Sequence, residues 1–170
     1  MLKLDFWPLN GLDSRVAGKL LLARMYEELT AEEIPPIEKA PRGKPYFPGS
    51  NLHFSITPPK TTVFCALSDT EIGIDAEDLT RQVRPNLAEK ILSPKEYAQY
   101  AALPEEEKNE ALLRFWVLKE AEAKCSGLGL RGYPDHTEFD LEDPRVQKLA
   151  GCMVAVIQAE APQVEDADAL

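Results

Sequence analysis

Hydrophobic and polar positions repeat with two different periods along the chain, and each period predicts a type of secondary structure. Apolar residues at helical spacing between 16 and 29 predict an amphipathic helix whose first turn is capped by Asp13 or Ser14. β-Branched and aromatic runs bounded by turn residues predict three consecutive strands, at 51–57, 61–68 and 71–76. An antiparallel meander is the simplest connection between these strands.

The second half of the chain carries mainly helical patterns. A short helix is expected near 85–91, and a second helix begins at Ser93, which is a good N-cap residue. A third helix is expected from Pro104 to Ser126, and Gly127 is typical of the residue that ends a helix.

Three further segments differ from these helices. Strands are expected at 137–141 and 152–157, where β-branched and apolar residues gather. The segment 160–170 has four acidic residues and no basic one, which is typical of a solvated, flexible tail. Five prolines and two glycines between 35 and 49 predict a long loop, and loops of this kind are often functional.

Composition predicts one packed domain, or two small fused lobes, in the cytoplasm. The chain has 170 residues, of which 44% are hydrophobic, and this is enough for a well-packed core. It has no apolar run of about 18 residues and no apolar segment typical of a signal peptide, so neither a membrane span nor export is expected. The three cysteines form no C-x-x-C pair, and reduced core thiols are expected.

The net charge limits the partners of the chain. A charge of −10 argues against nucleic acid, because phosphates require a basic surface. Any anionic ligand must therefore be held by a local cluster of cations.

Two carboxylates lie close together at the end of a predicted strand. Asp75 and Glu77 are two residues apart, so both side chains face the same side of the strand. Such a pair repels itself unless a cation lies between the carboxylates, and oxygen ligands of this kind suit Mg²⁺. The alternative is a strand end with two solvated acids.

One face of the third helix carries a second candidate group. Trp116, Glu120 and Lys124 are spaced four residues apart, which places a carboxylate and an ammonium one turn from each other beside an aromatic ring. The alternative is a surface Glu–Lys pair worth a few tenths of a kcal/mol. If this face meets the strand pair, the two together form a magnesium and phosphate site.

These motifs occur in an order that resembles the 4'-phosphopantetheinyl transferases of the surfactin-synthetase type. The order is Gly43-Lys44-Pro45, His53-Phe54, Gly73-Ile74-Asp75-x-Glu77 and Trp116-x-x-Lys119-Glu120-Ala121-x-x-Lys124. The resemblance covers residues 12–158, and it implies transfer of the phosphopantetheine arm of coenzyme A to a serine of an acyl or peptidyl carrier protein.

The resemblance also implies a fold. The family fold is α+β, with two similar lobes that contain antiparallel sheets and packed helices, and the active site lies between them. For this chain it implies an N-terminal lobe over 1–72, a C-terminal lobe over 73–159 and an acidic tail over 160–170. A monomer is expected.

The carboxylates and the helix lysine take family roles by position. The resemblance implies that Asp75, Glu77 and Glu120 bind Mg²⁺, which in turn binds the pyrophosphate of coenzyme A. It also implies that Glu120 is the base for the carrier serine, directly or through water, and that Lys124 assists the departing 3',5'-ADP.

Contacts with coenzyme A follow from the same resemblance. Lys44 is the expected phosphate contact, and Arg15 is a further candidate. At the position of the family histidine that touches the 3'-phosphate, this chain has Pro58. Lys60 is a possible substitute as a point charge. The departure at Pro58 leaves open an alternative, namely a homologue that binds the carrier or coenzyme A without transfer.

The segment after the metal motif faces the carrier protein in this family. In this chain the segment 81–95 contains four basic residues and a single acid: Arg81, Arg84, Lys90 and Lys95 against Glu89. A basic patch here suits an acidic carrier protein, whereas the alternative is a solvated helix face.

Overall fold

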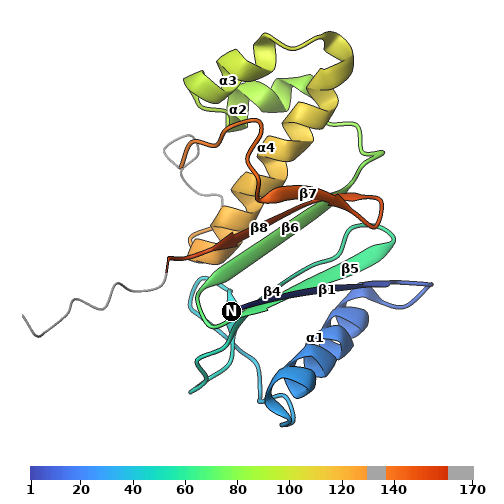
Figure 1. Cartoon of the computed structure of the whole chain (residues 1–170), viewed down its shortest axis with the longest axis vertical. Helices are drawn as coiled ribbons and strands as arrows, with labels where there is room; N and C mark the ends of the chain where they lie inside the picture. The colour runs from blue at the N-terminus through green and yellow to red at the C-terminus, as the bar shows by residue number, and fades with distance from the viewer. Residues whose placement is uncertain (130–136, 161–170) are drawn as a thin grey trace, which may run out of the picture.

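The fold consists of two three-stranded antiparallel sheets between helices (Figure 1). The computed structural model describes residues 1–129 and 137–160. The N-terminal sheet has the order β1-β5-β4, formed by Leu2–Pro8, Thr62–Ser68 and His53–Thr57. The C-terminal sheet has the order β6-β8-β7, formed by Ile72–Asp78, Cys152–Gln158 and Val146–Leu149. The α+β prediction is therefore confirmed.

The helices cover the outer faces of these sheets. Helix α1 packs on the N-terminal sheet, and helix α4 packs on the C-terminal sheet with the shorter helices at its N-terminal end (Figure 1). Their bounds are Ser14–Thr30 for α1, Pro85–Leu87 for the 3₁₀-helix η1, Ala88–Ile91 for α2, Pro94–Ala101 for α3 and Glu105–Ser126 for α4. Asp13 caps α1, Ser93 caps α3, and Gly127 ends α4, as predicted.

The expected meander is wrong at its third strand. β4 pairs with β5, but β6 pairs with β8, which lies more than 70 residues away in the sequence. The alternation of β6 explains this arrangement. Ile72, Ile74 and Ala76 face the apolar core between the two sheets, whereas the residues between them face α4.

Two further strands differ from the expectations. Residues 2–8 form β1, which was not predicted and which pairs with β5 along its whole length. The strand expected at 137–141 is absent from the described part of that segment, because side chains of α3 take its backbone donors. Phe139 N donates to Glu96 Oε1 at 2.8 Å, and Leu141 N donates to Gln99 Oε1 at 3.0 Å.

Two predicted segments remain, the proline-rich loop and the acidic tail. The proline-rich loop contains one small hairpin, in which β2 (Glu38–Lys39) pairs with β3 (Pro45–Tyr46). The predicted acidic tail lies outside the described residues except for Glu160. Among the described helices, none is long and apolar enough to cross a lipid bilayer.

The three cysteines are free thiols and are buried, as predicted. They lie in different layers of the fold, on β5, α4 and β8. Burial raises the pKa of Cys65 to about 12 and that of Cys152 to about 11. Burial also raises the pKa of Cys125.

A buried ion pair connects α3 with α4. Lys119 Nζ lies 2.8 Å from Glu96 Oε2, and the side chains are 3% and 0% exposed. The Glu96 carboxylate also accepts from the backbone N–H groups of Ser93 and Phe139, both at 2.8 Å. A buried carboxylate with this many donors fixes the position of α3 against the helix that carries Glu120.

Helix α4 approaches β6 most closely at Gly73. A Cβ atom at this position would lie 1.9 Å from Ala121 O and 2.4 Å from Cys125 N. Both are backbone atoms of α4, so no side-chain rotation relieves the overlap. Only glycine allows α4 to lie this close to the strand.

We expect Gly73→Ala to lower the free energy of unfolding by at least about 2 kcal/mol, because α4 must move away from β6. Urea unfolding followed by circular dichroism measures this loss. Gly18→Ala is the control, because its Cβ meets only side-chain atoms, namely Ile56 Cγ2 at 3.1 Å and Val63 Cγ2 at 3.5 Å. Equal stability of the two variants would contradict this account of Gly73.

Lys119→Met should lower the free energy of unfolding by about 3–5 kcal/mol, because it leaves the buried Glu96 carboxylate without its cation. Lys148→Met is the matched control. Lys148 pairs with Glu110 at 2.7 Å on the surface, where both side chains are about half exposed, so its loss should be much smaller. Similar losses in both variants would show that the buried pair does not stabilise the packing of α3.

Candidate active site

Strand β6 and helix α4 bring the predicted strand and helix motifs together. Asp75 and Glu77 face α4, on the side of β6 opposite the core between the sheets. Lys124 Nζ donates to Asp75 Oδ1 at 2.7 Å, and Trp116 Nε1 donates to Glu77 Oε1 at 3.1 Å. The two motifs therefore form one site.

Asp75 is the most buried carboxylate of the site, with 6% of the residue exposed. Its Oδ1 atom accepts from Lys124 and from Thr57 Oγ1, the latter at 3.1 Å. In the described part of the chain its Oδ2 atom is buried without a hydrogen-bond donor. Burial raises the pKa of Asp75 above its usual value, although Lys124 opposes this shift.

Glu77 is held by two side chains. Besides the bond from Trp116, its carboxylate forms an ion pair with Arg81, which lies four residues farther along the chain. The Arg81 guanidinium also lies over the Trp116 ring, 5.8 Å from its centroid. Arg81 is therefore part of the site, although the sequence suggested a place in a surface patch.

Glu120 lies half-buried on α4 near both strand carboxylates. Burial raises its pKa to about 7, and the negative charges of Asp75 and Glu77 add to this shift. Lys124 and Arg81 act in the opposite direction. A carboxyl group with this pKa exchanges its proton near neutral pH, which suits a general base.

Lys124 lies at the centre of the site. Besides Asp75, its ammonium donates to the backbone carbonyl of Ile74 at 3.2 Å. The side chain is 34% exposed, so part of it remains accessible. This position places a positive charge beside the carboxylates and at the wall of an adjacent cleft.

The carboxylates fit a hard divalent cation that shares its coordination with water and phosphate. Mg²⁺ commonly takes one or two protein carboxylates and completes its shell with water and phosphate oxygens. A buried oxygen without a donor, Asp75 Oδ2, is the group that such a cation would satisfy. Within residues 1–129 and 137–160, no three His, Cys, Asp or Glu side chains form a ready-made metal cluster.

Lys44 lies beside the C-terminal end of α4, next to two clefts. Each cleft has a volume of about 290 Å³; the first is lined by Lys44 and Lys124, and the second by Lys44 and His53. The Lys44 ammonium donates to Cys125 O at 2.5 Å and forms an ion pair with Glu71. His53 Nδ1 lies 3.2 Å from the same glutamate. Lys44 thus reaches the site edge, but its ammonium is bound to protein groups.

The other two predicted coenzyme A contacts are placed differently. Lys60 lies near the Glu77 end of the site, because its backbone N–H donates to Asp78 Oδ2 at 3.1 Å. Arg15 is not brought to the site: its side chain is 88% exposed, and its guanidinium pairs with Asp13 at 3.7 Å. Helix α1 covers the face of the N-terminal sheet that is turned away from β6.

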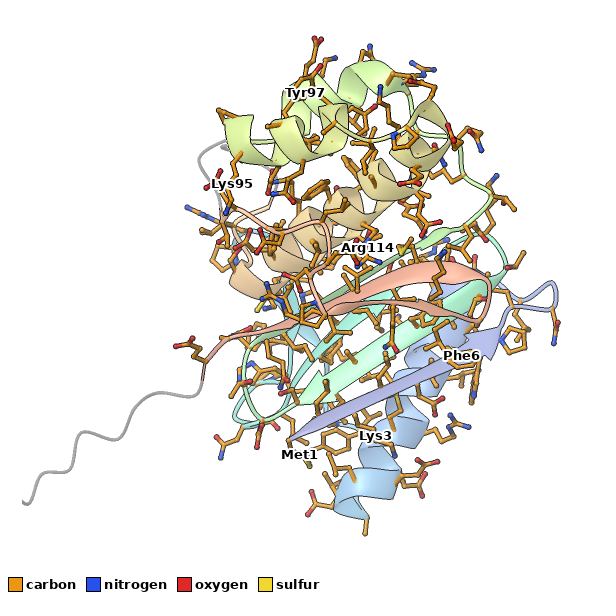
Figure 2. All side chains as sticks on the ribbon, turned by 45° about the horizontal axis from the view of Figure 1, so that its top comes forward. Met1, Lys3, Phe6, Lys95, Tyr97 and Arg114 are labelled. Atoms are coloured by element: carbon orange, nitrogen blue, oxygen red, sulfur yellow. The ribbon has the colours of Figure 1, made fainter. Side chains whose placement is uncertain are left out.

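The basic segment 81–95 lies at the end of the molecule formed by α2 and α3. Arg84 and Lys90 are exposed, and Lys95 lies 3.7 Å from Asp140. Figure 2 shows Lys95 and the partly exposed Tyr97 together on this surface. Arg81 belongs to the carboxylate site, so three of the four predicted cations remain candidates for the patch.

Sequence reasoning missed Thr57 and Ser55, which link the N-terminal sheet to the site. Both residues lie on the β4 face opposite α1, two positions apart. Ser55 Oγ accepts from Ile74 N at 3.1 Å, and Thr57 donates to Asp75. The available signal was a pair of hydroxyl residues at strand spacing, but a local pattern does not identify the facing strand.

The raised pKa of Glu120 predicts a pH-dependent stability. The folded protein holds this proton up to about pH 7, whereas the unfolded chain releases it near the usual value of 4.5. The free energy of unfolding that comes from holding this proton is therefore fully present below about pH 4.5. It is lost as the pH rises through about 7. Glutamine cannot ionise. Relative to the unsubstituted protein, Glu120→Gln should therefore be more stable at pH 8 than it is at pH 5.

Thermal unfolding in a chelating buffer at both pH values measures this effect. The quantity of interest is the difference in melting temperature between Glu120→Gln and the unsubstituted protein. Glu106→Gln, an exposed acid at the other end of α4, should show no such pH-dependent difference. A difference for Glu120→Gln that is the same at pH 5 and pH 8 would mean that Glu120 has an ordinary pKa.

Comparisons with known proteins identify the family of the segment that carries this site. A sequence profile of the 4'-phosphopantetheinyl transferase superfamily matches residues 71–161, more than half of the chain. The matched segment begins just before β6 and extends beyond β8, so it contains every carboxylate of the site and all of α4.

Several curated proteins are similar over part of their length. The 4'-phosphopantetheinyl transferase HetI of Nostoc sp. is 36% identical over 99 residues, which cover 52% of this chain and 40% of that protein. A 4'-phosphopantetheinyl transferase of Bacillus subtilis is 32% identical over 59% of this chain and 45% of its own. AcpT of Salmonella typhimurium, also a 4'-phosphopantetheinyl transferase, is 33% identical over 67% of this chain and 58% of its own.

The chain spans less than two thirds of the length of each of these relatives. The match to the superfamily profile nevertheless covers both elements that form the site. The chain therefore belongs to the 4'-phosphopantetheinyl transferase superfamily.

Proposed function

We propose that this protein transfers the 4'-phosphopantetheine arm of coenzyme A to a serine of an acyl or peptidyl carrier protein, with Mg²⁺ and with release of 3',5'-ADP. The observation that carries this proposal is the meeting of β6 and α4, which pairs Lys124 with Asp75 and brings Glu120 within electrostatic reach of Asp75 and Glu77. Membership of the superfamily supports the reaction type.

Asp75, Glu77 and Glu120 are the residues that would hold Mg²⁺. When bound, the ion neutralises charge on the pyrophosphate of coenzyme A during phosphoryl transfer. Asp75 contributes its free Oδ2 atom, and Lys124 and Thr57 hold the other oxygen. Trp116 and Arg81 hold Glu77 at the edge of the site.

Glu120 would act on the attacking serine, and Lys124 would act on the leaving 3',5'-ADP. The serine oxygen of the carrier forms a new bond to the β-phosphorus of coenzyme A, and the bond from that phosphorus to the ADP oxygen breaks. Glu120 takes the proton of the serine hydroxyl, directly or through one water, as a positioned general base. Lys124 lies one turn away and stabilises the negative charge on the departing 3',5'-ADP.

The clefts beside Lys44 would receive coenzyme A. The first cleft joins Lys44 to Lys124, so a bound phosphate chain could pass between the two ammonium groups. Lys60 remains a candidate phosphate contact at the opposite end of the site, and Arg15 is the weakest candidate because it is remote and exposed. Binding requires Lys44 to exchange Glu71 for phosphate.

The carrier protein would dock on the basic surface of Arg84, Lys90 and Lys95. All three are exposed: Arg84 directly precedes η1, Lys90 lies on α2 and Lys95 lies on α3. Opposite charge on an acidic carrier would speed association and orient it.

The division of the chain into lobes over 1–72 and 73–159 is part of the proposal. Each sheet has its own helix and its own core, which supports two lobes of similar design. The cytoplasmic location and the monomeric state remain predictions from the sequence.

A second function is favoured by the environment of Lys44. Its ammonium is bound by Glu71 and by the carbonyl of Cys125, and Pro58 replaces the expected histidine. A homologue with these features could bind a carrier or coenzyme A without transferring the arm. Carrier binding without turnover, unchanged in Glu120→Gln, would favour this second function.

The central test is a mass measurement on carrier proteins. Purified protein, Mg²⁺, coenzyme A and a panel of apo-carriers should yield a carrier whose serine has gained the phosphopantetheine mass. Asp75→Ala and Glu120→Ala should each reduce transfer by at least about a hundredfold, because each removes charge that acts on the phosphoryl group. Glu106→Gln is the control and should retain full transfer.

The absence of a mass gain on every carrier serine in the panel would overturn the proposed function. Full activity of both alanine variants would instead refute the assignment of Asp75 and Glu120 to the site. Circular dichroism of each variant confirms that a loss of transfer reflects the site rather than the fold.

A further inference from the structure

Two hydroxyl groups of β4 reach across to β6. Ser55 Oγ accepts from Ile74 N at 3.1 Å, and Thr57 Oγ1 donates to Asp75 Oδ1 at 3.1 Å. β4 belongs to the N-terminal sheet and β6 to the C-terminal sheet, so these side chains connect the two sheets. The first contact holds backbone, whereas the second holds a carboxylate of the site.

The contact of Thr57 with Asp75 is buried. Thr57 is 4% exposed and Asp75 is 6% exposed, so water competes little for either group. A hydroxyl in such a place has few other partners, and its bond to a carboxylate is stronger than a neutral hydrogen bond. Thr57 therefore holds Asp75 in one orientation.

The orientation of Asp75 decides which of its oxygens is available. Thr57 and Lys124 both donate to Oδ1, while Oδ2 is buried without a donor among the described residues. A carboxylate held through one oxygen presents the other as a fixed ligand. Groups that hold a metal-binding carboxylate commonly change metal affinity about 10–100-fold when they are removed.

We propose that Thr57 is a positioning residue, which holds Asp75 Oδ1 from the opposite sheet and thereby directs Oδ2 to a divalent cation. This inference rests on the proposed function, because that function identifies the cation as Mg²⁺. In this role Thr57 acts through Asp75, to which its hydroxyl donates. It also makes the N-terminal sheet a contributor to the metal site, although all proposed ligands lie on β6 and α4.

The experiment is a calorimetric titration of the purified full chain with Mn²⁺ alone, without coenzyme A. Thr57→Val keeps the shape of the side chain and removes the hydroxyl, so the dissociation constant for Mn²⁺ should rise by about tenfold or more. Thr57→Ser restores a hydroxyl and should bind Mn²⁺ within about threefold of the unsubstituted protein.

Ser55→Ala is the matched control. It removes the neighbouring bond between β4 and β6 but leaves Asp75 with both of its donors. Its Mn²⁺ affinity should stay within about threefold of the unsubstituted protein, even if its melting temperature falls. A purely structural role of Thr57 predicts instead that Ser55→Ala and Thr57→Val weaken Mn²⁺ binding equally.

A kinetic measurement gives a second signature. In the transfer assay, Thr57→Val should raise the Mg²⁺ concentration for half-maximal rate while the KM for coenzyme A changes little. If Thr57→Val does not fold, Thr57→Ala removes the same hydroxyl with a smaller side chain and takes its place in both measurements.

The outcomes separate this inference from the proposed function. Unchanged Mn²⁺ affinity in Thr57→Val, equal weakening in Ser55→Ala, or no Mn²⁺ binding by the unsubstituted protein would overturn the role of Thr57. Weakened Mn²⁺ binding in Thr57→Val together with no transfer to any carrier would support the role of Thr57 and overturn the transferase.

Discussion

The approach of α4 to β6 at Gly73 is the constraint on which the site depends. Because glycine has no side chain, backbone atoms of α4 occupy the space that a Cβ atom would need. The next residues of β6 that face the same side, Asp75 and Glu77, are then brought against α4 within reach of Lys124 and Trp116. A wider separation between strand and helix would leave two solvated acids and a surface lysine, which are the simpler alternatives for these motifs.

Polar groups hold this arrangement from both sides. On one side, the buried pair of Lys119 and Glu96 fastens α3 to the helix that carries Glu120. On the other side, Thr57 of β4 holds Asp75. The site is therefore not a feature of β6 and α4 alone. Each neighbouring layer contributes a buried hydrogen bond, and such bonds are strong where water is excluded.

Local signals predicted α4 and its ends, because a proline start and a glycine end are properties of nearby residues. Strand and helix periods placed Asp75 with Glu77, and Glu120 with Lys124, on shared faces, but it was the resemblance to the transferase family that joined the two pairs as one predicted site. The pairing of β6 with β8 could not be predicted in this way, since it joins segments more than 70 residues apart. The strand expected near Phe139 was wrong because Glu96, distant in sequence, takes its backbone donor. The resemblance predicted Lys44 as a coenzyme A phosphate contact, but its bonds to Glu71 and Cys125 arise only from the fold.

The three buried thiols give the molecule a reporter in each of three layers. Cys65 faces the core beneath α1, Cys125 lies near the end of α4, and Cys152 lies in the core between the sheets. Alkylation requires an exposed thiolate, so each cysteine is protected while its own layer is closed. Labelling rates under native conditions therefore measure the opening of each layer separately. Equal rates would indicate that the layers open as one cooperative unit, whereas a faster Cys125 would indicate that the end of α4 opens by itself.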